Sequence, residues 1–505
     1  MMQSVRVTVD GKERICESGE LLSRIIKGEM PCGGHGKCGK CKVIAAGALS
    51  PMSESERLAL SEEEIRNGVR LACMARAVGD CSVSTSLEQG RGDRKIVTEG
   101  DLPALSLQPG FAAYGVAVDI GTTTLAARLY NAAGELLATA ARLNSQAPWG
   151  ADVISRIEAD LKGEGRALAK AIRNDLNELV MELAAQGSIS TNEIDGMVIT
   201  GNTVMLHLLT ETTTEPLSHA PFRAERLYGE TVTAEALELS ALCAETEIYL
   251  PSCISAFVGA DITCAILSTE LTKQEKPSLL ADIGTNGELA LWANGRLTVC
   301  STAAGPAFEG VGISMGMNAR EGAIDRVALD GEALCAHVIG EGTPCGICGS
   351  GLIDGVACLL ENEILDPSGY LEEDPIVIAE PVTLSQKDIR MVQLAKSAVC
   401  AGMTTLIRCE GLFEEDVFTL FVAGGFGKYL NMKNAGRIGL LPSALVNQTR
   451  SVGNAALSGA VMLLLDARLR EFSREIASKG ATVDLSVNPI FMDAYTMGMI
   501  FDDEI

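Results

Sequence analysis

Residues 114–130 read YGVAVDIGTTTLAARLY, and residues 278–292 read SLLADIGTNGELALW. Each stretch is an apolar strand, the sequence Asp-Ile-Gly-Thr, and a second apolar strand. The glycine frees the backbone for a tight turn, so both stretches predict a β-hairpin with an aspartate and hydroxyl side chains near its tip. The recurrence predicts two halves of related architecture.

The chemistry of these two hairpin tips suits a polyphosphate. Backbone amides and threonine hydroxyls can hold phosphate oxygens, and an aspartate at a strand end can hold Mg²⁺ through water. A single Asp-x-Gly-Thr is usually only a turn, whereas two copies in matching contexts predict two loops that clamp a polyphosphate from both sides. The predicted residues are Asp119, Gly121, Thr122 and Thr123 on one loop and Asp282, Gly284, Thr285 and Asn286 on the other.

A third element, residues 421–427 (FVAGGFG), is an apolar strand that enters a diglycine. Gly424 and Gly425 would let a flat base or ribose pack on the backbone, although the same pattern also suits a simple strand-to-helix turn. Asn202 is predicted to orient the phosphate loops, or else only to close a turn.

The rest of the chain fits an α/β enzyme. From residue 111 onward, strand and helix patterns alternate, and the 505 residues include 52 glycines but few aromatics. The net charge of −25 argues against nucleic acid as a partner, and no apolar run is long enough for a membrane span. Residues 88–110 lack periodicity and predict a linker.

The N-terminal residues predict a separate small domain that ends near residue 87. Alternating residues on either side of Asp10-Gly11 indicate a hairpin, and residues 21–26 indicate a short helix. Ser53-x-x-Glu56 and Ser61-x-x-Glu64 match the capping box of two further helices. With short strands after the cysteine-rich loop, this order predicts a β-grasp domain.

That loop, Cys32-x5-Cys38-x2-Cys41, predicts an iron–sulfur site. With Cys73 it offers the four thiolates that a [2Fe-2S] cluster needs, and its glycines let the backbone approach the sulfides. The start of the chain shows no export signal, so thiols or metal ligands are expected here, in the cytoplasm, rather than disulfides. Paired Cys-x2-Cys units, typical of zinc, are not the pattern here.

Three alternatives bear on the ligand set. Cys81 is the alternative to Cys73 as fourth ligand. A Rieske-type centre would need a second histidine beside His35, and none of the other three histidines lies nearby in the sequence. Cys345 and Cys348 form one Cys-x2-Cys without a companion pair, so Cys348 is interpreted as a small buried residue.

The ordered motifs of residues 111–505 resemble the superfamily of sugar kinases, heat-shock 70 proteins and actin. The resemblance implies an α/β fold of two ribonuclease-H-like lobes, about 111–275 and 276–505, with ATP in the cleft between them. In this resemblance the connecting motifs match 200–203 and 454–460, and the adenosine motif matches 422–427.

A [2Fe-2S] β-grasp domain (1–87) followed by this ATPase (111–505) closely resembles the reductive activators of corrinoid proteins. One departure is that longer members carry an extra small domain where this chain has only the segment 88–110, which puts dimerisation through that region in doubt. The resemblance is carried by residues 32–41, 70–73, 150–157, 200–203, 257–261, 282–288, 304–310, 346–354 and 423–427.

The resemblance implies ATP-dependent reduction of a Co(II) corrinoid to Co(I) on a methyltransferase partner. An upstream low-potential donor would supply the electrons to this chain. Ser301 or Thr302 would lie near the cleft mouth and face the corrinoid, the alternative being that they cap the helix near Phe308. Glu288 and Glu309 are the candidates to position the attacking water. The oligomeric state stays open, with a homodimer among the alternatives.

Three other functions are compatible with the residues. An activator of acyl-CoA dehydratases would hold a different cluster between subunits, which the N-terminal loop argues against. A small-molecule kinase with a regulatory cluster would need a catalytic base and an acceptor pocket that the sequence does not identify. An ATP-gated redox switch would change conformation without a corrinoid partner.

Overall fold

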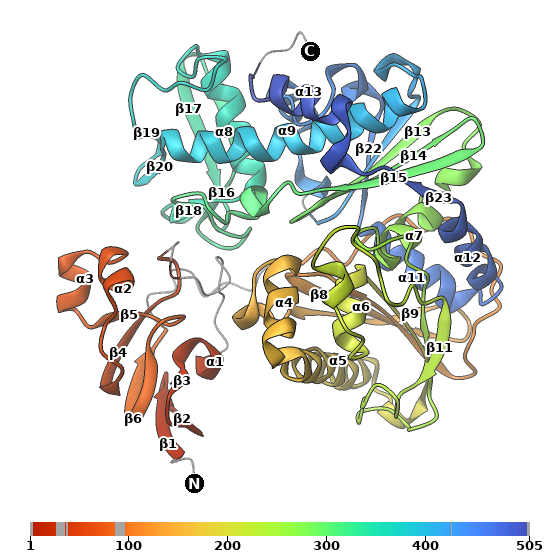
Figure 1. Ribbon diagram of the computed structural model, residues 1–505, viewed down its shortest axis with the longest axis horizontal. Helices are drawn as coiled ribbons and strands as arrows, with labels where there is room; N and C mark the ends of the chain where they lie inside the picture. Colours follow the sequence, from red (N-terminus) through yellow and green to blue (C-terminus); the bar gives the residue numbers. More distant parts are fainter. Residues whose placement is uncertain (1–3, 27–35, 37–38, 86–95, 426, 502–505) are drawn as a thin grey trace.

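A computed structural model describes residues 4–26, 36, 39–85, 96–425 and 427–501. The chain forms an N-terminal domain, up to residue 85, and two larger lobes beside it (Figure 1). We call residues 114–275 the first lobe and residues 276–501 the second lobe, because each contains one six-stranded sheet. Among the described helices, none is long and apolar enough to cross a membrane.

The N-terminal domain is a mixed sheet with strand order β2-β1-β6-β4-β5, with β3 paired to β6. The predicted hairpin is confirmed: Asp10 and Gly11 form its turn with φ of 46° and 82°, the left-handed conformation of a two-residue hairpin turn. The elements are β1 (Ser4–Val9), β2 (Lys12–Glu17), β3 (Glu20–Leu21), α1 (Leu22–Ile26), β4 (Lys42–Leu49), α2 (Glu54–Leu58), α3 (Glu62–Arg66), β5 (Val69–Leu71) and β6 (Arg76–Ser84).

The two predicted capping boxes have different outcomes. Ser61 caps α3 and Glu64 accepts the Ser61 amide, so this box is complete. Ser53 caps α2, but the Glu56 side chain turns inward to Arg70. The predicted box is wrong there because a buried guanidinium needs a charged partner more than an exposed amide does.

The first lobe has strand order β11-β12-β10-β7-β8-β9, in which β7 and β8 form the predicted hairpin and β10 runs parallel to β7. Apolar faces of the sheet pack on α5 in a core of buried Leu, Ile and Val side chains. The elements are β7 (Tyr114–Ile120), β8 (Thr124–Asn131), β9 (Leu136–Leu143), α4 (Val153–Ala159), α5 (Gly165–Gly187), β10 (Ile194–Gly201), α6 (Thr203–Leu209), β11 (Glu230–Thr233), β12 (Glu247–Leu250) and α7 (Ala260–Ser268).

The second lobe has strand order β22-β21-β13-β14-β15-β23, which repeats five strands of the first sheet and places its sixth strand, β23, at the opposite edge. Its hairpin is β13–β14, and β21 runs parallel to β13 as β10 does to β7. The main elements are β13 (Ser278–Ile283), β14 (Gly287–Ala293), β15 (Arg296–Thr302), α8 (Gly349–Glu361), α9 (Gln386–Cys409), β21 (Thr419–Ala423), α10 (Met432–Arg437), β22 (Thr449–Gly453), α11 (Ala455–Leu465), α12 (Leu469–Lys479), β23 (Gly480–Thr482) and α13 (Pro489–Met497).

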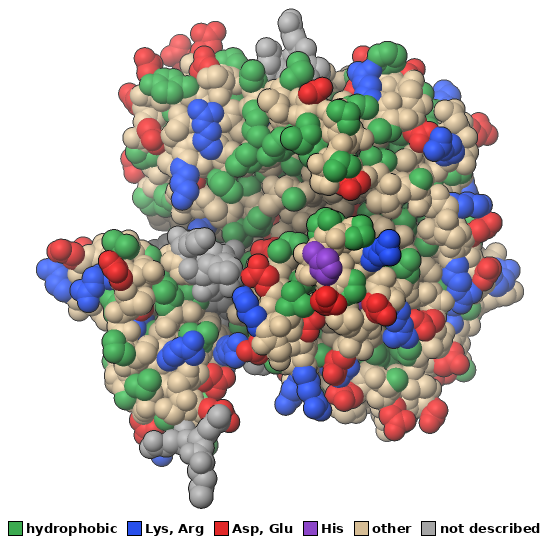
Figure 2. All heavy atoms as spheres, viewed as in Figure 1, with side chains coloured by type: hydrophobic (Ala, Val, Ile, Leu, Met, Phe, Trp, Pro, Cys, Tyr) green, Lys and Arg blue, Asp and Glu red, His purple; other side chains and the backbone are tan. Residues whose placement is uncertain are grey.

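Two small sheets complete the second lobe beside α8 and α9 (Figure 1). Their strands are β16 (Ala323–Asp330), β17 (Ala333–Val338), β18 (Gly346–Ile347), β19 (Ile376–Ala379) and β20 (Val382–Leu384). On the face shown in Figure 2, apolar side chains gather over α9 and α13, where Leu394, Met492 and Met497 are exposed.

Helices α7 and α11 join the two lobes. They pack directly on each other, and buried residues of both sheets surround them in a shared core. The approach is so close that a Cβ on Gly459 would lie 2.1 Å from the carbonyl oxygen of Cys264. Only glycine fits at this crossing.

Residues 96–110, the described part of the segment predicted to be a linker, run along the second lobe. The Asp101 amide donates to the Val452 carbonyl at 3.1 Å, and the Asn454 amide donates to the Glu99 carbonyl at 2.9 Å. The segment is therefore packed against β22 and the start of α11.

The N-terminal domain contacts each lobe through a basic side chain. Arg24 pairs with Glu164 of the first lobe at 2.9 Å. Lys40 donates to the carbonyls of Gly310, Ile313 and Gly316 in the second lobe at 2.8, 2.6 and 3.1 Å.

Candidate functional site

A cleft between the two lobes brings most of the predicted residues together. Its volume is about 280 Å³, close to the lower end of small-ligand pockets. Of the predicted nucleotide and catalytic residues, Ser301 does not line it, and neither does its alternative Thr302. The predicted residues that do are Asp119, Gly121, Thr122, Thr123, Asn202, Asp282, Gly284, Thr285, Asn286, Glu288, Glu309, Gly424 and Gly425.

The first loop is a tight turn held from behind. The Gly121 amide donates to the Thr124 carbonyl at 2.9 Å, and a Cβ on Gly121 would lie 2.8 Å from that oxygen. The Asn144 side chain donates to the Gly121 carbonyl at 2.9 Å, and the buried Arg156 donates to the Thr122 carbonyl. The carbonyls of Gly121 and Thr122 are thus held behind the loop. Inside the cleft they would repel a phosphate.

Asn202 combines the two roles considered for it. Its side-chain amide donates to the Thr122 hydroxyl at 3.2 Å, and its side-chain oxygen accepts from the Met205 amide and so caps α6. It therefore fixes the first loop relative to a helix start.

The second loop faces the first across the cleft, and Glu309 bridges them. The Gly284 amide donates to the Asn286 carbonyl at 3.0 Å. The Glu309 carboxylate accepts from the Thr285 hydroxyl at 2.6 Å and from the Thr123 hydroxyl at 3.0 Å. One carboxylate therefore accepts from one hydroxyl of each loop.

Four carboxyl groups share the floor of the cleft. Burial raises the pKa of Asp119 to about 6, although a hydrogen bond from Asn454 lowers it in part. Burial, together with the negative charge of the nearby Asp119, raises the pKa of Asp282 to about 7. Burial and then their acidic neighbours also raise the pKa of Asp261 and of Glu288. A cation is the natural complement of such a group.

These carboxylates do not form a direct metal cage. Within the described ranges, no three Asp, Glu, His or Cys side chains converge closely enough to hold a metal. Mg²⁺ keeps several of its waters and is bound through one or two carboxylates plus substrate phosphates. The donor set of Asp119 and Asp282 thus fits a hydrated Mg²⁺ that reaches phosphates between the loops.

Besides α6, which Asn202 caps, three of the described α-helices begin at the cleft. α7 starts with Asp261 in its first turn, α8 starts at Gly349 with no side-chain cap, and α11 is capped by Asn454. Their first residues are among those that line the cleft. Backbone amides at helix starts favour anions, so this end of the cleft suits phosphates.

The predicted diglycine sits beside the second loop. Gly424 has φ of +93°, and a Cβ there would lie 2.8 Å from a carboxylate oxygen of Asp282. Gly425 is exposed next to Val97. Both glycines and Tyr429 line the cleft, and the exposed glycine backbone with an aromatic ring nearby suits a base or ribose.

Ser301 and Thr302 lie on β15, at the edge of this arrangement. Ser301 is the strand partner of Glu288, and Thr302 donates to the Ala398 carbonyl at 3.1 Å. The helix at Pro306–Glu309 begins after Gly305 with no side-chain cap. The alternative that Ser301 or Thr302 caps it is therefore wrong, and their role toward a corrinoid stays a prediction.

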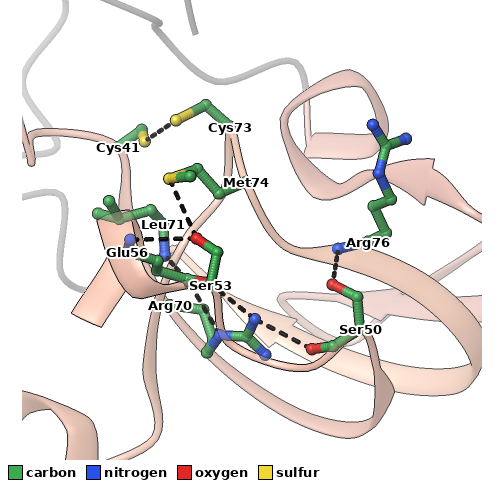
Figure 3. A network of polar contacts seen from close by, with 9 residues as sticks. All are labelled: Cys41, Ser50, Ser53, Glu56, Arg70, Leu71, Cys73, Met74 and Arg76. Carbon is green, nitrogen blue, oxygen red and sulfur yellow. Dashed lines mark hydrogen bonds and ion pairs between the residues drawn. The ribbon is translucent and has the colours of Figure 1, made fainter. Parts of the chain in front are cut away.

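The predicted iron–sulfur site is described in part. Cys41 and Cys73 come from separate segments, are buried, and place their sulfur atoms 3.2 Å apart without a disulfide (Figure 3). Gly36 packs on Met74 so closely that a Cβ would lie 2.4 Å from its sulfur. Cys32, Cys38 and His35 lie outside the described residues. Cysteine thiolates are the ligands of iron–sulfur clusters, so the converging thiols of Cys41 and Cys73 fit two of the four positions that a [2Fe-2S] cluster would need.

Cys81 lies elsewhere in the domain. It is on β6, within the sheet, where burial raises its pKa and its charge acts on Cys16. Cys73 is therefore better placed than Cys81 to join Cys41.

Several residues of the site carry no predicted role. Asp261 and Asn454 lie within motifs quoted above, and Ile96 and Val97 fell in the predicted linker. Asp261 had a usable signal, an acidic residue after Gly259 at a helix start. Residues 96 and 97 had none, because no local pattern reports packing against a segment about 350 residues away.

Comparison with known proteins assigns most of the chain. A family model described as the RACo middle region matches residues 114–274, and one described as the C-terminal, ASKHA domain of RACo matches residues 276–504. A solved structure titled reductive activator for corrinoid, iron-sulfur protein aligns with a TM-score of 0.71 and 28% identity, over 98% of each chain.

Two curated proteins are similar in sequence. The corrinoid activation enzyme RamQ of Eubacterium limosum is 33% identical over 425 residues, which cover 78% of this chain and 71% of that protein. A Co(II) methylated amine-specific corrinoid protein reductase of Methanosarcina barkeri is 28% identical over 398 residues, 72% of each.

Proposed function

The chain belongs to the RACo family of corrinoid activators, oxidoreductases with an ASKHA-type ATPase domain, and from this we propose that it uses ATP to reduce a corrinoid protein from Co(II) to Co(I). The cobalt gains one electron, and the chain's own iron–sulfur site loses one. A corrinoid protein of a methyltransferase system is the proposed partner, and a low-potential donor restores the lost electron.

The N-terminal domain is proposed to be a ferredoxin-like β-grasp domain. Cys32, Cys38, Cys41 and Cys73 would hold a [2Fe-2S] cluster, which when bound supplies a one-electron carrier near about −400 mV. Two observations support this proposal. The Cys41 and Cys73 sulfur atoms lie 3.2 Å apart, and the strands around them form the mixed sheet β2-β1-β6-β4-β5.

The cleft is proposed to bind Mg-ATP. The hydroxyls of Thr122, Thr123 and Thr285 and the loop amides would hold the phosphates, with Asp119 and Asp282 on hydrated Mg²⁺. Gly424 and Gly425 would pack on adenosine, while Glu288 or Glu309 would position the attacking water.

A nucleotide is needed because the electron transfer is uphill. The Co(II)/Co(I) couple of a corrinoid is more negative than the potential of such a cluster, and each ~100 mV costs about 2.3 kcal/mol for one electron. Closure of the two lobes on ATP would offset this cost by binding the partner in a geometry that removes the axial cobalt ligand. The potential of the iron–sulfur site need not change.

One observation carries the proposal. Lys40, the residue before Cys41 in the sequence, donates hydrogen bonds to the segment that follows Glu309, and Glu309 bridges the two phosphate loops. This chain of contacts between the Cys41 segment and the two phosphate loops supports a coupling of the proposed electron-carrying site to the proposed nucleotide site.

Anaerobic absorption spectroscopy tests the function. A Co(II) corrinoid protein is mixed with this protein and excess reductant, and we expect Co(I) to form with Mg-ATP but not without it. Asp282→Asn should abolish the ATP effect, while Asp493→Asn, at an exposed position on α13, should not. Equal Co(I) yields with and without ATP, while the iron–sulfur site is kept reduced, would contradict the proposal.

The same samples separate the other functions. Phosphorylation of a small-molecule acceptor would indicate a kinase. A nucleotide-dependent conformational change with no Co(I) formation would indicate a redox switch.

A further inference from the structure

A short segment, residues 306–317, links the two sites. We call it the latch segment. It begins with the helix Pro306–Glu309, so the carboxylate that bridges Thr123 and Thr285 lies near its start. The bridged hydroxyls belong to different lobes, which makes Glu309 sensitive to both loops at once.

The latch segment is compact and internally bonded. The Val311 amide donates to the Pro306 carbonyl at 3.0 Å, and the Gly316 amide donates to the Ile313 carbonyl at 3.1 Å. Gly310 has φ of +79°, and a Cβ there would lie 2.6 Å from the Met317 nitrogen. Such a segment shifts as a unit rather than bending at one bond.

Lys40 joins the N-terminal domain to this segment. An ammonium group has three donors, and Lys40 gives them to the carbonyls of Gly310, Ile313 and Gly316. The Lys40 side chain therefore holds three points of the latch segment at once. Lys40 is also the residue that precedes Cys41 in the chain.

A polyphosphate competes with Glu309. Phosphate oxygens would accept hydrogen bonds from the same hydroxyls of Thr123 and Thr285, and their negative charge would repel the carboxylate. Binding should therefore break the Glu309 bridge and release the start of the latch segment.

We propose that Lys40 is a positioning residue that carries this displacement to the Cys41 side of the iron–sulfur site. When a nucleotide displaces Glu309, the latch segment moves and pulls the N-terminal domain with it through Lys40. The inference rests on the proposed function, because it gives the nucleotide a mechanical route to the electron-carrying site.

Trp149 provides a reporter on the other side of the N-terminal domain. Its indole donates to Glu164 at 3.1 Å, and the Arg24 guanidinium lies 5.4 Å from its ring centre. Arg24 also pairs with Glu164. If the domain follows Lys40 away from the first lobe, Arg24 leaves Trp149 and the indole emission changes.

The experiment measures Trp149 emission in a Trp292→Phe background, since the chain has only these two tryptophans. Mg-ATP is added to the full-length protein without a corrinoid partner. We expect a change in emission in the parent and its loss in Lys40→Met. Lys42→Met is the matched control, because Lys42 pairs with Glu64 inside the same domain and should leave the response intact.

Glu309→Ala is an independent second variant. Without the bridge, the nucleotide-free protein should already show the emission of the ATP-bound parent. Iron and sulfide contents that match the parent show that each variant is intact. A full ATP response in Lys40→Met, or parent-like emission in nucleotide-free Glu309→Ala, overturns the inference. Because cobalt is absent, these results are independent of the Co(I) assay that tests the function.

Discussion

The Glu56 carboxylate holds Arg70 with both oxygens, at 2.8 Å from Nε and 2.9 Å from Nη2 (Figure 3). The same carboxylate accepts the Leu71 amide at 2.8 Å. Both partners are buried, and Leu71 lies two residues before Cys73. The pair thus ties α2 to the backbone that positions one of the two described thiols.

Removing one partner of this pair should destabilise the N-terminal domain. Arg70→Met leaves Glu56 buried without its cation, and breaking a buried pair in this way costs about 3–5 kcal/mol. Urea unfolding followed by the visible absorption of the proposed iron–sulfur site should show a lower midpoint.

Glu64→Gln is the control for that experiment. It breaks the half-exposed pair with Lys42 but keeps a side-chain oxygen for the Ser61 amide, so its cost should stay below about 1 kcal/mol. Equal midpoints for Arg70→Met and the parent would show that the pair does not support the domain.

The cleft carboxylates predict a stability that falls as pH rises. With pKa values raised to about 6 for Asp119 and about 7 for Asp282, the folded protein binds more protons than the unfolded one between pH 4 and 7. Stability without Mg²⁺ should therefore be lost as the pH rises through this window. Mg-ATP should reverse the loss, because it complements the charges.

Asp282→Asn tests the pH prediction. It removes one titrating group and its repulsion of Asp261 and Glu288. When the pH rises from 5 to 8, the free energy of unfolding should decrease in both proteins. The decrease should be smaller in Asp282→Asn, and the difference between the two decreases should be roughly 1–2 kcal/mol, a modest value because the Asp282 side chain is only partly shielded from water. Chemical unfolding at pH 5 and pH 8 measures both free energies. If stability depended on pH equally in the variant and the parent, Asp282 would not be the titrating group.

The fourth thiolate can be identified by substitution. Cys73→Ser should abolish iron and sulfide binding, because the Cys73 sulfur is 3.2 Å from that of Cys41. Cys81→Ser should retain both, because Cys81 lies within the sheet on β6. Iron and sulfide analysis after anaerobic reconstitution distinguishes them, and loss of both in Cys81→Ser alone would reverse the assignment.

Asn454 should matter for nucleotide binding as well as for stability. Asn454→Ala removes the cap of α11, which costs about 0.5–2 kcal/mol, and the hydrogen bond to Asp119 at 3.0 Å. The pKa of Asp119 then rises further, so Mg-ATP binding should weaken at pH 7 and recover at higher pH.

Asn431→Ala is the matched control for Asn454→Ala. Asn431 caps α10 and is not among the residues that line the cleft, so its loss should lower stability without changing the pH profile of binding. Titration calorimetry at several pH values gives that profile. Parallel profiles for Asn454→Ala and the parent would contradict the role given to Asn454.

The sequence predicted the features that depend on neighbours along the chain. The two hairpins with Asp119 and Asp282 near their tips depend on apolar alternation and one glycine each, and the structure contains both. The same holds for the Asp10-Gly11 turn and for the Ser61 cap.

Features that depend on distant residues were missed. Glu56 matched a capping box but pairs with Arg70, and Lys40 contacts carbonyls about 270 residues away. Asp261 joins Asp119 and Asp282 only because two lobes fold together. Local patterns report helix starts and turns, whereas such pairings depend on which surfaces meet in the folded chain.

The contact of Gly459 with the Cys264 carbonyl has a consequence for movement. Gly459 lets the two helix backbones lie in direct contact, so this crossing is the point about which one lobe would rotate against the other. α7 begins beside the cleft in the first lobe and α11 begins beside it in the second, so a small rotation at this crossing becomes opening or closing at the mouth. A single methyl group at position 459 would push the two helices apart and so change the angle at which the two lobes meet.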